Sequence, residues 1–563
     1  MPTVRLALAQ LNVTVGDLDG NRRLIEQAIR RAQAWQADLL VVPELSICGY
    51  PPEDLLLKPQ FIEDNRQALS RLAPFATNMV ALVGFVDQDQ RGQTYNAAAV
   101  LANGRHVTTY RKQCLPNYGV FDEPRYFTAG SQAVILSIRD VRVGVTICED
   151  LWEPQPSRVL AAAGAQVVAN LSASPYHVRK LQARQALFRG RARAHGLAIA
   201  YCNLVGGQDE LVFDGASMVI DSSGKTIGLA AQCRVDLLIA DLPVEVPRRL
   251  GRSRSPVIPV LGRRRERPPL ARPAPQRVLG PVEEVYEALA LGLKDYARKN
   301  RFSTVVLGLS GGIDSAVTAC LAVDALGAEQ VVGVVMPSRF SSQETQDDAR
   351  QLAGAFGIRC HTLTIEPMFE AYLKVLESIF ANRPMELAEQ NLQARIRGSL
   401  LMALSNKFGW LVLATGNKSE MATGYTTLYG DMAGGLAVIK DVPKTLVYQL
   451  ARWRNARGPA APIPSGILTR APTAELAPNQ RDQDTLPAYE TLDRIITAYV
   501  EEDRSLRDIV RQQGIDPSTA RQVITMIDRS EYKRRQGPPG IKITPKAFGR
   551  DRRMPITNQY RAP

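Results

Sequence analysis

Short apolar runs alternate with helical stretches along the first 242 residues of the chain. Apolar positions that are continuous or alternate with polar ones predict strands at 4–9, 38–43, 79–86, 96–102, 133–138, 141–147, 166–170, 198–205 and 216–220. Apolar residues at helical spacing predict helices that include 21–35 and 180–195. Strands interleaved with helices in this way are typical of an α/β fold.

The same alternation returns in residues 281–563. Predicted strands at 304–307, 331–336, 358–364 and 410–415 are separated by predicted helices that include 315–326 and 342–356. Consecutive strand–helix–strand units of this length favour a parallel sheet. No internal repeat relates the two halves, so we expect two different α/β domains.

The segment between the halves, residues 243–280, has a different composition. It contains ten arginines against two glutamates and is rich in proline. Proline favours an extended backbone, and a run of like charges stays in contact with water. We therefore predict three parts: a domain at 1–242, a Pro/Arg-rich linker at 243–280 and a second domain at 281–563.

The net charge of +13 raises the question of a nucleic-acid partner. Much of the positive charge lies in the linker and in residues 529–553, which hold nine lysines or arginines against two acids. Only 6% of residues are aromatic, and none interrupts the arginine run to stack on bases. We expect no nucleic-acid partner, and we expect residues 529–553 to form an ordered lid over phosphates.

The remaining composition is that of a globular enzyme. No apolar run approaches the roughly 20 residues that a membrane span needs, and the first residues lack the pattern of a secretory signal. Seven cysteines without a C-x-x-C pair and four scattered histidines indicate neither a disulfide framework nor a zinc site. We expect a reduced, cytoplasmic protein without a membrane partner.

A glycine-rich turn follows the predicted strand at 304–307 and leads into a helix. Such a turn directs backbone N–H groups at an anion, although a corner whose glycines serve only packing is the alternative. No lysine follows the glycines, so this is not the common P-loop. Its Ser-Gly-Gly-x-Asp-Ser form resembles the pyrophosphate loop of the ATP pyrophosphatases. The expected ATP-binding residues are Gly308, Leu309, Ser310, Gly311, Gly312, Ile313, Asp314 and Ser315.

Three segments of the first half carry groups suited to acyl transfer. Glu44 ends an apolar strand, Lys112 precedes a turn, and Cys148 stands at a strand-to-turn junction. A thiol at such a junction can project into a cleft with backbone N–H groups behind it. Taken singly, a buried core cysteine and two surface charges would explain them equally well.

Together, these segments resemble the nitrilase superfamily, whose catalytic set is Glu, Lys and Cys in this chain order. With the pyrophosphate loop, the whole chain resembles the bacterial glutamine-dependent NAD synthetases. The resemblance implies a nitrilase-like αββα sandwich followed by a Rossmann-like parallel α/β domain. The matching segments are Pro43–Leu45, Gly49–Pro51, Leu115–Glu123, Cys148–Asp150, Glu389–Gly398, Thr415–Glu420, Pro472–Leu476, Glu531–Gln536 and Ala547–Arg553.

For the first half, the resemblance implies a glutaminase. Glu44 would accept the thiol proton, Cys148 would attack the amide carbon of glutamine, and Lys112 would stabilise the oxyanion. Glu123 would assist Lys112, and a low pKa is expected for a cysteine near a lysine. A Cys-His-Glu triad is the alternative, although no histidine lies near Cys148 in sequence.

The resemblance also implies that Tyr118, Ser174 and Lys180 contact the glutamine. Each has an ordinary alternative. Tyr118 could pack a turn, Ser174 could cap a helix, and Lys180 could be a surface charge in the first turn of a helix.

For the second half, the resemblance implies conversion of deamido-NAD to NAD through an adenylated carboxylate. Thr415 and the glycine-rich loop would hold ATP, and Asp314 and Glu420 would contact Mg²⁺. Asn391, Glu420 and Lys533 would hold deamido-NAD. Asp314 could instead be a helix N-cap, and Asn391 and Lys533 plain surface residues.

The two halves would be coupled by ammonia, which we expect to pass through an internal tunnel. Two alternatives remain. The chain could be another glutamine-dependent adenylating amidotransferase, or a non-catalytic binding protein that retains an inactive nitrilase fold. The family forms homodimers or larger homo-oligomers, so a homo-oligomer is expected.

Overall fold

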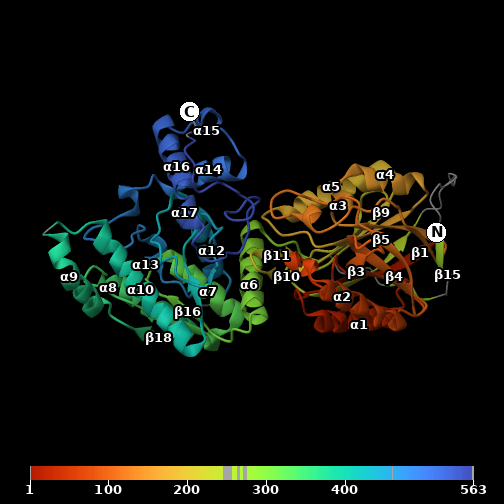
Figure 1. Ribbon diagram of the computed structural model, residues 1–563, viewed down its shortest axis with the longest axis horizontal. Coiled ribbons are helices and arrows are strands. Elements are labelled where there is room, and N and C mark those ends of the chain that lie inside the picture. Colours follow the sequence, from red (N-terminus) through yellow and green to blue (C-terminus); the bar gives the residue numbers. More distant parts are fainter. Residues whose placement is uncertain are drawn as a thin grey trace. The chain divides into compact units, whose positions relative to one another are not determined.

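The computed structural model describes residues 2–244, 257–262, 267–270, 276–381, 383–458 and 461–560 (Figure 1). The chain forms two compact units. The first comprises Met1–Gln208 and Val212–Leu279, and the second comprises Asp209–Leu211 and Gly280–Pro563. Both units combine sheets with helices, which confirms the predicted α/β class.

One sheet of the first unit has six strands in the order β14-β1-β2-β3-β4-β5. Its centre, β1-β2-β3, is parallel, and the three other strands run antiparallel to their neighbours. The strands are β1 (Thr3–Gln10), β2 (Leu39–Val41), β3 (Val80–Gln88), β4 (Thr94–Ala102), β5 (Arg105–Arg111) and β14 (Asp236–Pro243).

The other large sheet of this unit has seven strands in the order β13-β12-β9-β8-β7-β6-β15, with β7, β8 and β9 parallel. The strands are β6 (Ile135–Ile138), β7 (Val141–Ile147), β8 (Val167–Ser172), β9 (Ala198–Asn203), β12 (Met218–Ile220), β13 (Thr226–Leu229) and β15 (Val257–Leu261). A separate hairpin pairs β10 (Val205–Gln208) with β11 (Leu211–Asp214).

The two large sheets pack face to face through their alternating apolar residues. One buried cluster joins Leu6 and Leu82 of the first sheet to Val145 and Leu171 of the second. Side chains that alternate along a strand point to opposite faces, so every second residue reaches this shared core.

Helices cover the outer faces of both sheets. The helices α1 (Leu18–Ala34) and α2 (Pro59–Ser70) lie on one side, and α4 (Pro154–Ala162) and α5 (Lys180–His195) lie on the other (Figure 1). Phe188 of α5 packs on Val168 and Tyr201 of the second sheet. The predicted αββα sandwich is therefore confirmed.

The predicted strands of this unit fall within a few residues of observed ones, except that the stretch 198–205 divides into β9 and the start of β10. Five observed strands were not predicted: β5, β11, β13, β14 and β15. The strand β5 is an edge strand with mostly polar residues, so it lacks the apolar run on which the prediction rests.

The segment 243–280 differs in part from the extended linker that its composition predicts. Residues 257–261 form β15, which pairs in parallel with β6, because Val257, Ile258, Val260 and Leu261 are apolar. Arg267 forms an ion pair with Asp38. These parts of the segment are folded onto the first unit, whereas 245–256, 263–266 and 271–275 lie outside the described residues.

The second unit contains a parallel sheet of five strands in the order β18-β17-β16-β19-β20. The chain first builds the sheet outward from β16 and then returns to place β19 on its other side. This creates a topological switch point between β16 and β19, where crevices open at the carboxyl ends of the strands. The strands are β16 (Val305–Gly308), β17 (Val331–Val335), β18 (Arg359–Thr362), β19 (Leu411–Ala414) and β20 (Leu436–Ala437).

Helices surround this sheet, which confirms the predicted Rossmann-like arrangement. They are α6 (Pro281–Lys299), α7 (Ile313–Leu326), α8 (Gln343–Phe356), α9 (Glu366–Phe380), α10 (Leu387–Phe408), α11 (Lys418–Thr423), α12 (Lys444–Ala456) and α13 (Ser465–Thr469). No helix among the described residues is both long and apolar enough to cross a bilayer.

A helical cluster with its own apolar core follows the sheet. Leu492, Ile509 and Ile524 are buried there against one another's helices. The helices are α14 (Tyr489–Ile496), α15 (Leu506–Gln513), α16 (Pro517–Arg529) and α17 (Glu531–Arg534). This cluster accounts for residues that the sequence pattern left unassigned.

The basic segment 529–553 is ordered, but its charges are largely neutralised within the second unit. Arg534 is buried beside Glu531, and four of the other eight basic side chains also form ion pairs with acids. These pairs hold the segment to the second unit, and Lys533 of the same segment lines the cavity of that unit, so a lid over phosphates stays a prediction. The four other pairs are Arg535–Glu531, Lys542–Asp551, Lys546–Asp503 and Arg552–Asp528.

Asp241 fastens two parts of the first unit, and its replacement tests that role. It accepts bonds from Arg5 Nε (2.8 Å), Arg5 Nη2 (2.9 Å) and the Leu270 N–H (2.9 Å). Although partial burial opposes ionisation, Arg5 and Leu270 hold the pKa of Asp241 below its ordinary value. Asp241→Asn should lower the melting temperature at pH 7 by about 2–4 °C, because charge-assisted bonds are lost.

The pH dependence of this effect has a defined sign. A carboxylate whose folded pKa is depressed stabilises the protein above its unfolded pKa of about 3.9, and the stabilisation disappears as pH falls through the lower folded value. The difference between the proteins should therefore persist at pH 5 and shrink only below about pH 4. Asp19→Asn, at an exposed side chain, is the control, and an equal effect of both substitutions would contradict the assignment.

Candidate functional site

Glu44 lies in the turn after β2 and is completely buried. Its Oε1 accepts hydrogen bonds from Lys112 Nζ and Asn96 Nδ2, both at 2.7 Å, and its Oε2 accepts one from the Ala173 N–H at 2.9 Å. Gly84 of β3 permits this turn to approach, because a Cβ there would stand 2.4 Å from the Pro43 carbonyl oxygen. The carboxylate is thus held from three segments of chain.

Lys112 follows β5 and is also buried. Its ammonium donates to Glu44 Oε1 and to Glu123 Oε1, both at 2.7 Å, and the Tyr50 hydroxyl donates to the same Glu123 oxygen at 3.1 Å. Burial opposes the charge of Lys112, but Glu123 and Glu44 together raise its pKa well above the usual value. Burial also raises the pKa of Glu123, to about 7.

Cys148 follows β7 and precedes α3 (Glu149–Trp152). It has φ +42° and ψ −100°, a backbone conformation that non-glycine residues rarely adopt and that is often found at functional sites. The residue is buried, and its N–H donates to the Leu171 carbonyl at 2.8 Å. This strained junction sets the thiol at the carboxyl end of the central parallel strands.

The sequence predicted a low pKa for Cys148, but its surroundings raise that pKa. Burial raises the pKa of Cys148 well above its ordinary value, the charge of Glu44 raises it further, and Lys112 only partly offsets both. The reason is that Lys112 is already paired with two carboxylates. A resting thiol beside a carboxylate suits general-base activation, in which the proton leaves as the sulfur attacks.

Two of the three residues expected to contact glutamine, Tyr118 and Lys180, lie near Cys148. The Tyr118 hydroxyl donates to both carboxylate oxygens of Glu149, each at 3.1 Å, and Glu149 follows Cys148 directly. Burial lowers the pKa of Lys180 to about 8, while Cys148 and Glu149 act in the opposite direction. Ser174 is buried beyond the end of β8.

The ordinary alternatives for two of these residues do not hold. Ser174 caps no described helix, since Arg179 is the residue before α5. Lys180 does begin that helix, but it is half-buried and its ammonium lies 4.3 Å from the centre of the Trp152 ring, so it is not a fully exposed charge. Asn96 and Tyr50 complete the site. Asn96 carried no sequence signal, whereas Tyr50 lies in the matching segment Gly49–Pro51 but was given no role, because its partner Glu123 is distant in the chain.

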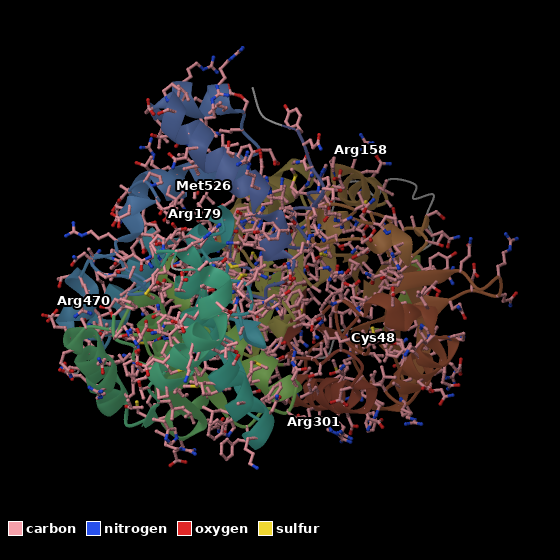
Figure 2. The ribbon with its side chains drawn as sticks, turned by 60° about the vertical axis from the view of Figure 1, so that its left-hand side comes forward. Cys48, Arg158, Arg179, Arg301, Arg470 and Met526 are labelled. Carbon is pink, nitrogen blue, oxygen red and sulfur yellow. The ribbon has the colours of Figure 1, made fainter. Side chains whose placement is uncertain are left out.

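A second site lies at the switch point of the parallel sheet. A cavity of about 700 Å³ opens there. It is lined by every residue predicted to act in the second half: Gly308, Leu309, Ser310, Gly311, Gly312, Ile313, Asp314, Ser315, Asn391, Thr415, Glu420 and Lys533. Arg470 and Met526, labelled in Figure 2, line the same cavity.

The glycine-rich loop at one wall of this cavity is tightly constrained. Gly311 has φ +77°, and a Cβ there would stand 2.1 Å from the Thr345 carbonyl oxygen. The Ser310 hydroxyl accepts from the Gly312 N–H at 3.2 Å, and the Ser315 hydroxyl donates to the Gly312 carbonyl at 3.0 Å. The glycines therefore serve a close backbone approach, and the loop opens helix α7, whose N-terminus favours an anion.

Asp314 stands in the first turn of α7 but is not its N-cap, which is Gly312. Its carboxylate accepts from Asn417 Nδ2 at 3.0 Å and forms an ion pair with Lys444. The same ammonium lies 3.4 Å from Glu420 Oε1. Burial raises the pKa of Glu420 to about 8, with Lys444 opposing and Asp314 contributing.

Asp314 and Glu420 could supply some, but not all, of the ligands of a magnesium ion. Asp314 and Glu420 supply hard oxygen ligands, and their mutual repulsion is relieved by a cation. Among the described residues no group of three or more histidine, cysteine or acidic side chains could hold a metal. Further ligands would therefore have to be substrate oxygens or water, as is usual for Mg²⁺.

The remaining predicted residues are held by the neighbouring loop. Asn391 Oδ1 accepts from the Thr427 hydroxyl at 2.9 Å. Lys533 Nζ donates to the carbonyls of Gly424 (2.7 Å) and Thr426 (2.8 Å), so it is not a free surface charge. The sequence prediction missed Lys444, Arg397 and Arg470, which also line the cavity.

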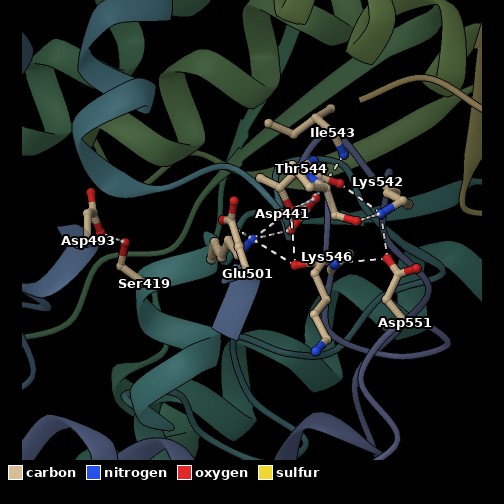
Figure 3. A network of polar contacts seen from close by, with 12 residues as sticks. Ser419, Asp441, Asp493, Glu501, Lys542, Ile543, Thr544, Lys546 and Asp551 are labelled. Atoms are coloured by element: carbon tan, nitrogen blue, oxygen red, sulfur yellow. Dashed lines mark hydrogen bonds and ion pairs between the residues drawn. The ribbon is translucent and has the colours of Figure 1, made fainter. Parts of the chain in front are cut away.

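Buried polar contacts are made by residues next to Glu420 and Lys444 in the sequence (Figure 3). Asp493 accepts from the Ser419 hydroxyl at 2.5 Å and from the Thr445 N–H at 2.9 Å. Since Ser419 precedes Glu420 and Thr445 follows Lys444, one carboxylate aligns the first turns of α11 and α12. Next to it, the buried ammonium of Lys418 contacts Asp441, Glu501 and Thr544.

Comparisons with known proteins agree with this division. Two family models match the chain: carbon-nitrogen hydrolase over residues 5–251 and NAD synthase over residues 285–537. The glutamine-dependent NAD(+) synthetase of Thermotoga maritima is 48% identical over 100% of both chains, and that of Aquifex aeolicus is 44% identical over 99% of this chain and 100% of its own.

Solved structures give the same result. The glutamine-dependent NAD+ synthetase of Acinetobacter baumannii, solved in complex with adenosine diphosphate, matches with a TM-score of 0.76 and 40% identity over 100% of both chains. The corresponding protein of Cytophaga hutchinsonii has a TM-score of 0.82 at 24% identity, which shows the shared fold.

The charge of Glu44 at the thiol can be tested by alkylation. Glu44→Gln removes the negative charge that raises the pKa of Cys148 and leaves the positive charge of Lys112. We expect the pH midpoint of Cys148 alkylation by iodoacetamide, followed by mass spectrometry of its peptide, to move to lower pH. Cys148→Ala gives the labelling background, Glu26→Gln at a surface helix should leave the midpoint unchanged, and an upward or absent shift in Glu44→Gln would refute the arrangement.

Proposed function

Because the chain belongs to the family of glutamine-dependent NAD(+) synthetases, we propose that it releases ammonia from glutamine at Cys148 and uses it at the cavity of the second unit. The reaction of this family is the ATP-dependent amidation of deamido-NAD to NAD. The observation that carries the assignment of residues is the Lys112 ammonium held by Glu44 and Glu123 beside a buried cysteine.

In the first unit, Glu44 accepts the thiol proton while the sulfur of Cys148 attacks the amide carbon of glutamine. Lys112 stabilises the oxyanion, and the proton on Glu44 passes to the departing ammonia. Glu44 then takes a proton from water, which hydrolyses the thioester to glutamate and restores the thiol. The raised pKa of Cys148 supports this order, because a resting thiol needs the base in the attacking step.

Glutamine would be bound by Tyr118, Ser174 and Lys180. The ammonium of Lys180 suits the substrate's carboxylate, and its half-buried position beside Trp152 strengthens that pairing relative to water. Glu149 holds the Tyr118 hydroxyl and so fixes one wall of the pocket.

In the second unit, the carboxylate of deamido-NAD attacks the α-phosphorus of ATP and pyrophosphate leaves. Ammonia then attacks the adenylated carbonyl, loses a proton, and AMP leaves. The loop 308–315 and Thr415 would hold ATP, with the loop's N–H groups directed at its phosphates. Asn391, Glu420 and Lys533 would hold deamido-NAD.

Magnesium, when bound by Asp314 and Glu420, would neutralise charge on the phosphates. Lys444 holds these two carboxylates together and would remain available to phosphate oxygens. Passage of ammonia within the protein, a homo-oligomeric state and a cytoplasmic location stay predictions. Membership of the family favours deamido-NAD over another acceptor and argues against a non-catalytic role.

Removing the nucleophile separates the two nitrogen sources. Cys148→Ala should abolish NAD formation from glutamine, by at least about 1000-fold, because no thioester can form. NAD formation from added ammonium chloride should stay within about twofold of wild type, since the second site is unchanged. Both rates are measured by chromatography of NAD and AMP.

The matched control is Cys202→Ala, a buried cysteine of β9 whose thiol donates to the Ala9 carbonyl at 3.4 Å. It should retain both activities. Equal loss of glutamine- and ammonia-driven synthesis in Cys148→Ala would reject the assignment of the nucleophile.

Asp314 should be required for synthesis from either source. Asp314→Asn removes a charge that pairs with Lys444 and is proposed to hold Mg²⁺. We expect a loss of at least about 100-fold with ammonium chloride as well as with glutamine, because adenylation precedes both. Asp324→Asn, near the other end of α7, is the control for helix stability and should keep most activity. Retention of ammonia-driven synthesis by Asp314→Asn would contradict the proposal.

A further inference from the structure

Asp150 lies two residues after Cys148, in α3, and is completely buried. Its carboxylate accepts four hydrogen bonds. One oxygen accepts from the Tyr110 hydroxyl (2.7 Å) and the Ile147 N–H (2.9 Å), and the other accepts from the N–H groups of Gln113 (3.1 Å) and Cys114 (2.8 Å). None of these partners has a role in the proposed chemistry.

The positions of the donors are informative. Tyr110, Gln113 and Cys114 flank Lys112 on both sides, while Ile147 immediately precedes Cys148. The carboxylate of Asp150 therefore joins the segment that carries Lys112 to the segment that carries Cys148. The first segment continues β5 of the six-stranded sheet, and the second continues β7 of the seven-stranded sheet.

The unusual backbone conformation of Cys148 depends on these bonds to Asp150. A residue with φ +42° and ψ −100° stays in that conformation only when its surroundings hold it. The bond from the Ile147 N–H to Asp150 closes a turn around Cys148, and the Leu151 N–H bonded to the Cys148 carbonyl at 3.0 Å continues it. The same carboxylate thus stabilises the strained junction and fixes its separation from Lys112.

We propose that Asp150 is a positioning residue of the glutaminase site, which sets the thiol of Cys148 against the ammonium of Lys112. This inference rests on the proposed function of that site. Asp150 acts through its bonds to the backbone next to Lys112 and Cys148, not through contact with the reacting groups. The geometry of attack, rather than the affinity for glutamine, depends on it.

Asp150→Asn tests this with almost no change of volume. All four partners are donors, and the new amide nitrogen cannot accept from any of them, so one side of the link must open. A shift of about 1 Å costs on the order of 100-fold in rate. We expect the kcat of glutamine-dependent NAD formation to fall about 100-fold, with the KM for glutamine within about threefold of wild type.

Two further variants distinguish positioning from a general loss of stability. Tyr110→Phe removes one donor and keeps the buried ring, and its kcat should fall less, by about tenfold. Asp38→Asn alters another buried carboxylate of this unit, which accepts from the Arg5 N–H and pairs with Arg139 and Arg267. It should lower the melting temperature without lowering kcat for glutamine.

Ammonia-driven NAD formation is the internal reference and should be unchanged in all three variants. Wild-type protein that releases no glutamate from glutamine would overturn the proposed function itself. With wild type active, an unchanged kcat in folded Asp150→Asn would overturn only the positioning role. If Asp150→Asn does not fold, folded Tyr110→Phe decides: a reduced kcat at constant KM supports the role, and wild-type kinetics refute it.

Discussion

The side chain of Lys112 is fully buried, and its ammonium forms ion pairs with two carboxylates. A buried charge without partners would be strongly destabilising, so Glu44 and Glu123 must hold fixed positions around it. Glu44 in turn needs Asn96 of β4 and the backbone after β8. The packing of two sheets face to face supplies these groups from segments that are distant in sequence. The αββα sandwich is thus the frame that makes this charged cluster stable next to a thiol.

The second unit uses a related arrangement for a different purpose. There too a lysine, Lys444, lies between two carboxylates, Asp314 and Glu420. The side chains of the first cluster are buried and paired, which suits a proton transfer between fixed groups. The second borders a cavity of about 700 Å³, so its carboxylates can meet a cation and phosphates that enter from outside. In each unit, one buried ammonium balances the charges of two carboxylates that come from distant parts of the sequence.

The basic residues near the C-terminus contribute to the internal structure of the second unit. Five basic residues of 529–553 form ion pairs with acids of the second unit, and Lys418 lies in a buried network with Asp441 and Glu501 (Figure 3). These contacts fix the C-terminal segment behind α11 and α12, which carry Glu420 and Lys444. The basic side chains in these contacts are therefore neutralised within the second unit.

The sequence by itself determined the alternation of strands and helices, the two-domain α/β class and the motif residues at strand ends, because these depend on local periodicity and on turns. It could not reveal that part of 243–280 joins a sheet as β15, since a short apolar run becomes a strand only beside a partner. Nor could the sequence reveal that the pKa of Cys148 is raised or that Lys444 lies between Asp314 and Glu420. It also could not reveal that Asp150 bonds to the segments next to both Lys112 and Cys148. Those features arise from burial and from contacts between residues up to 130 positions apart, which only the tertiary structure brings together.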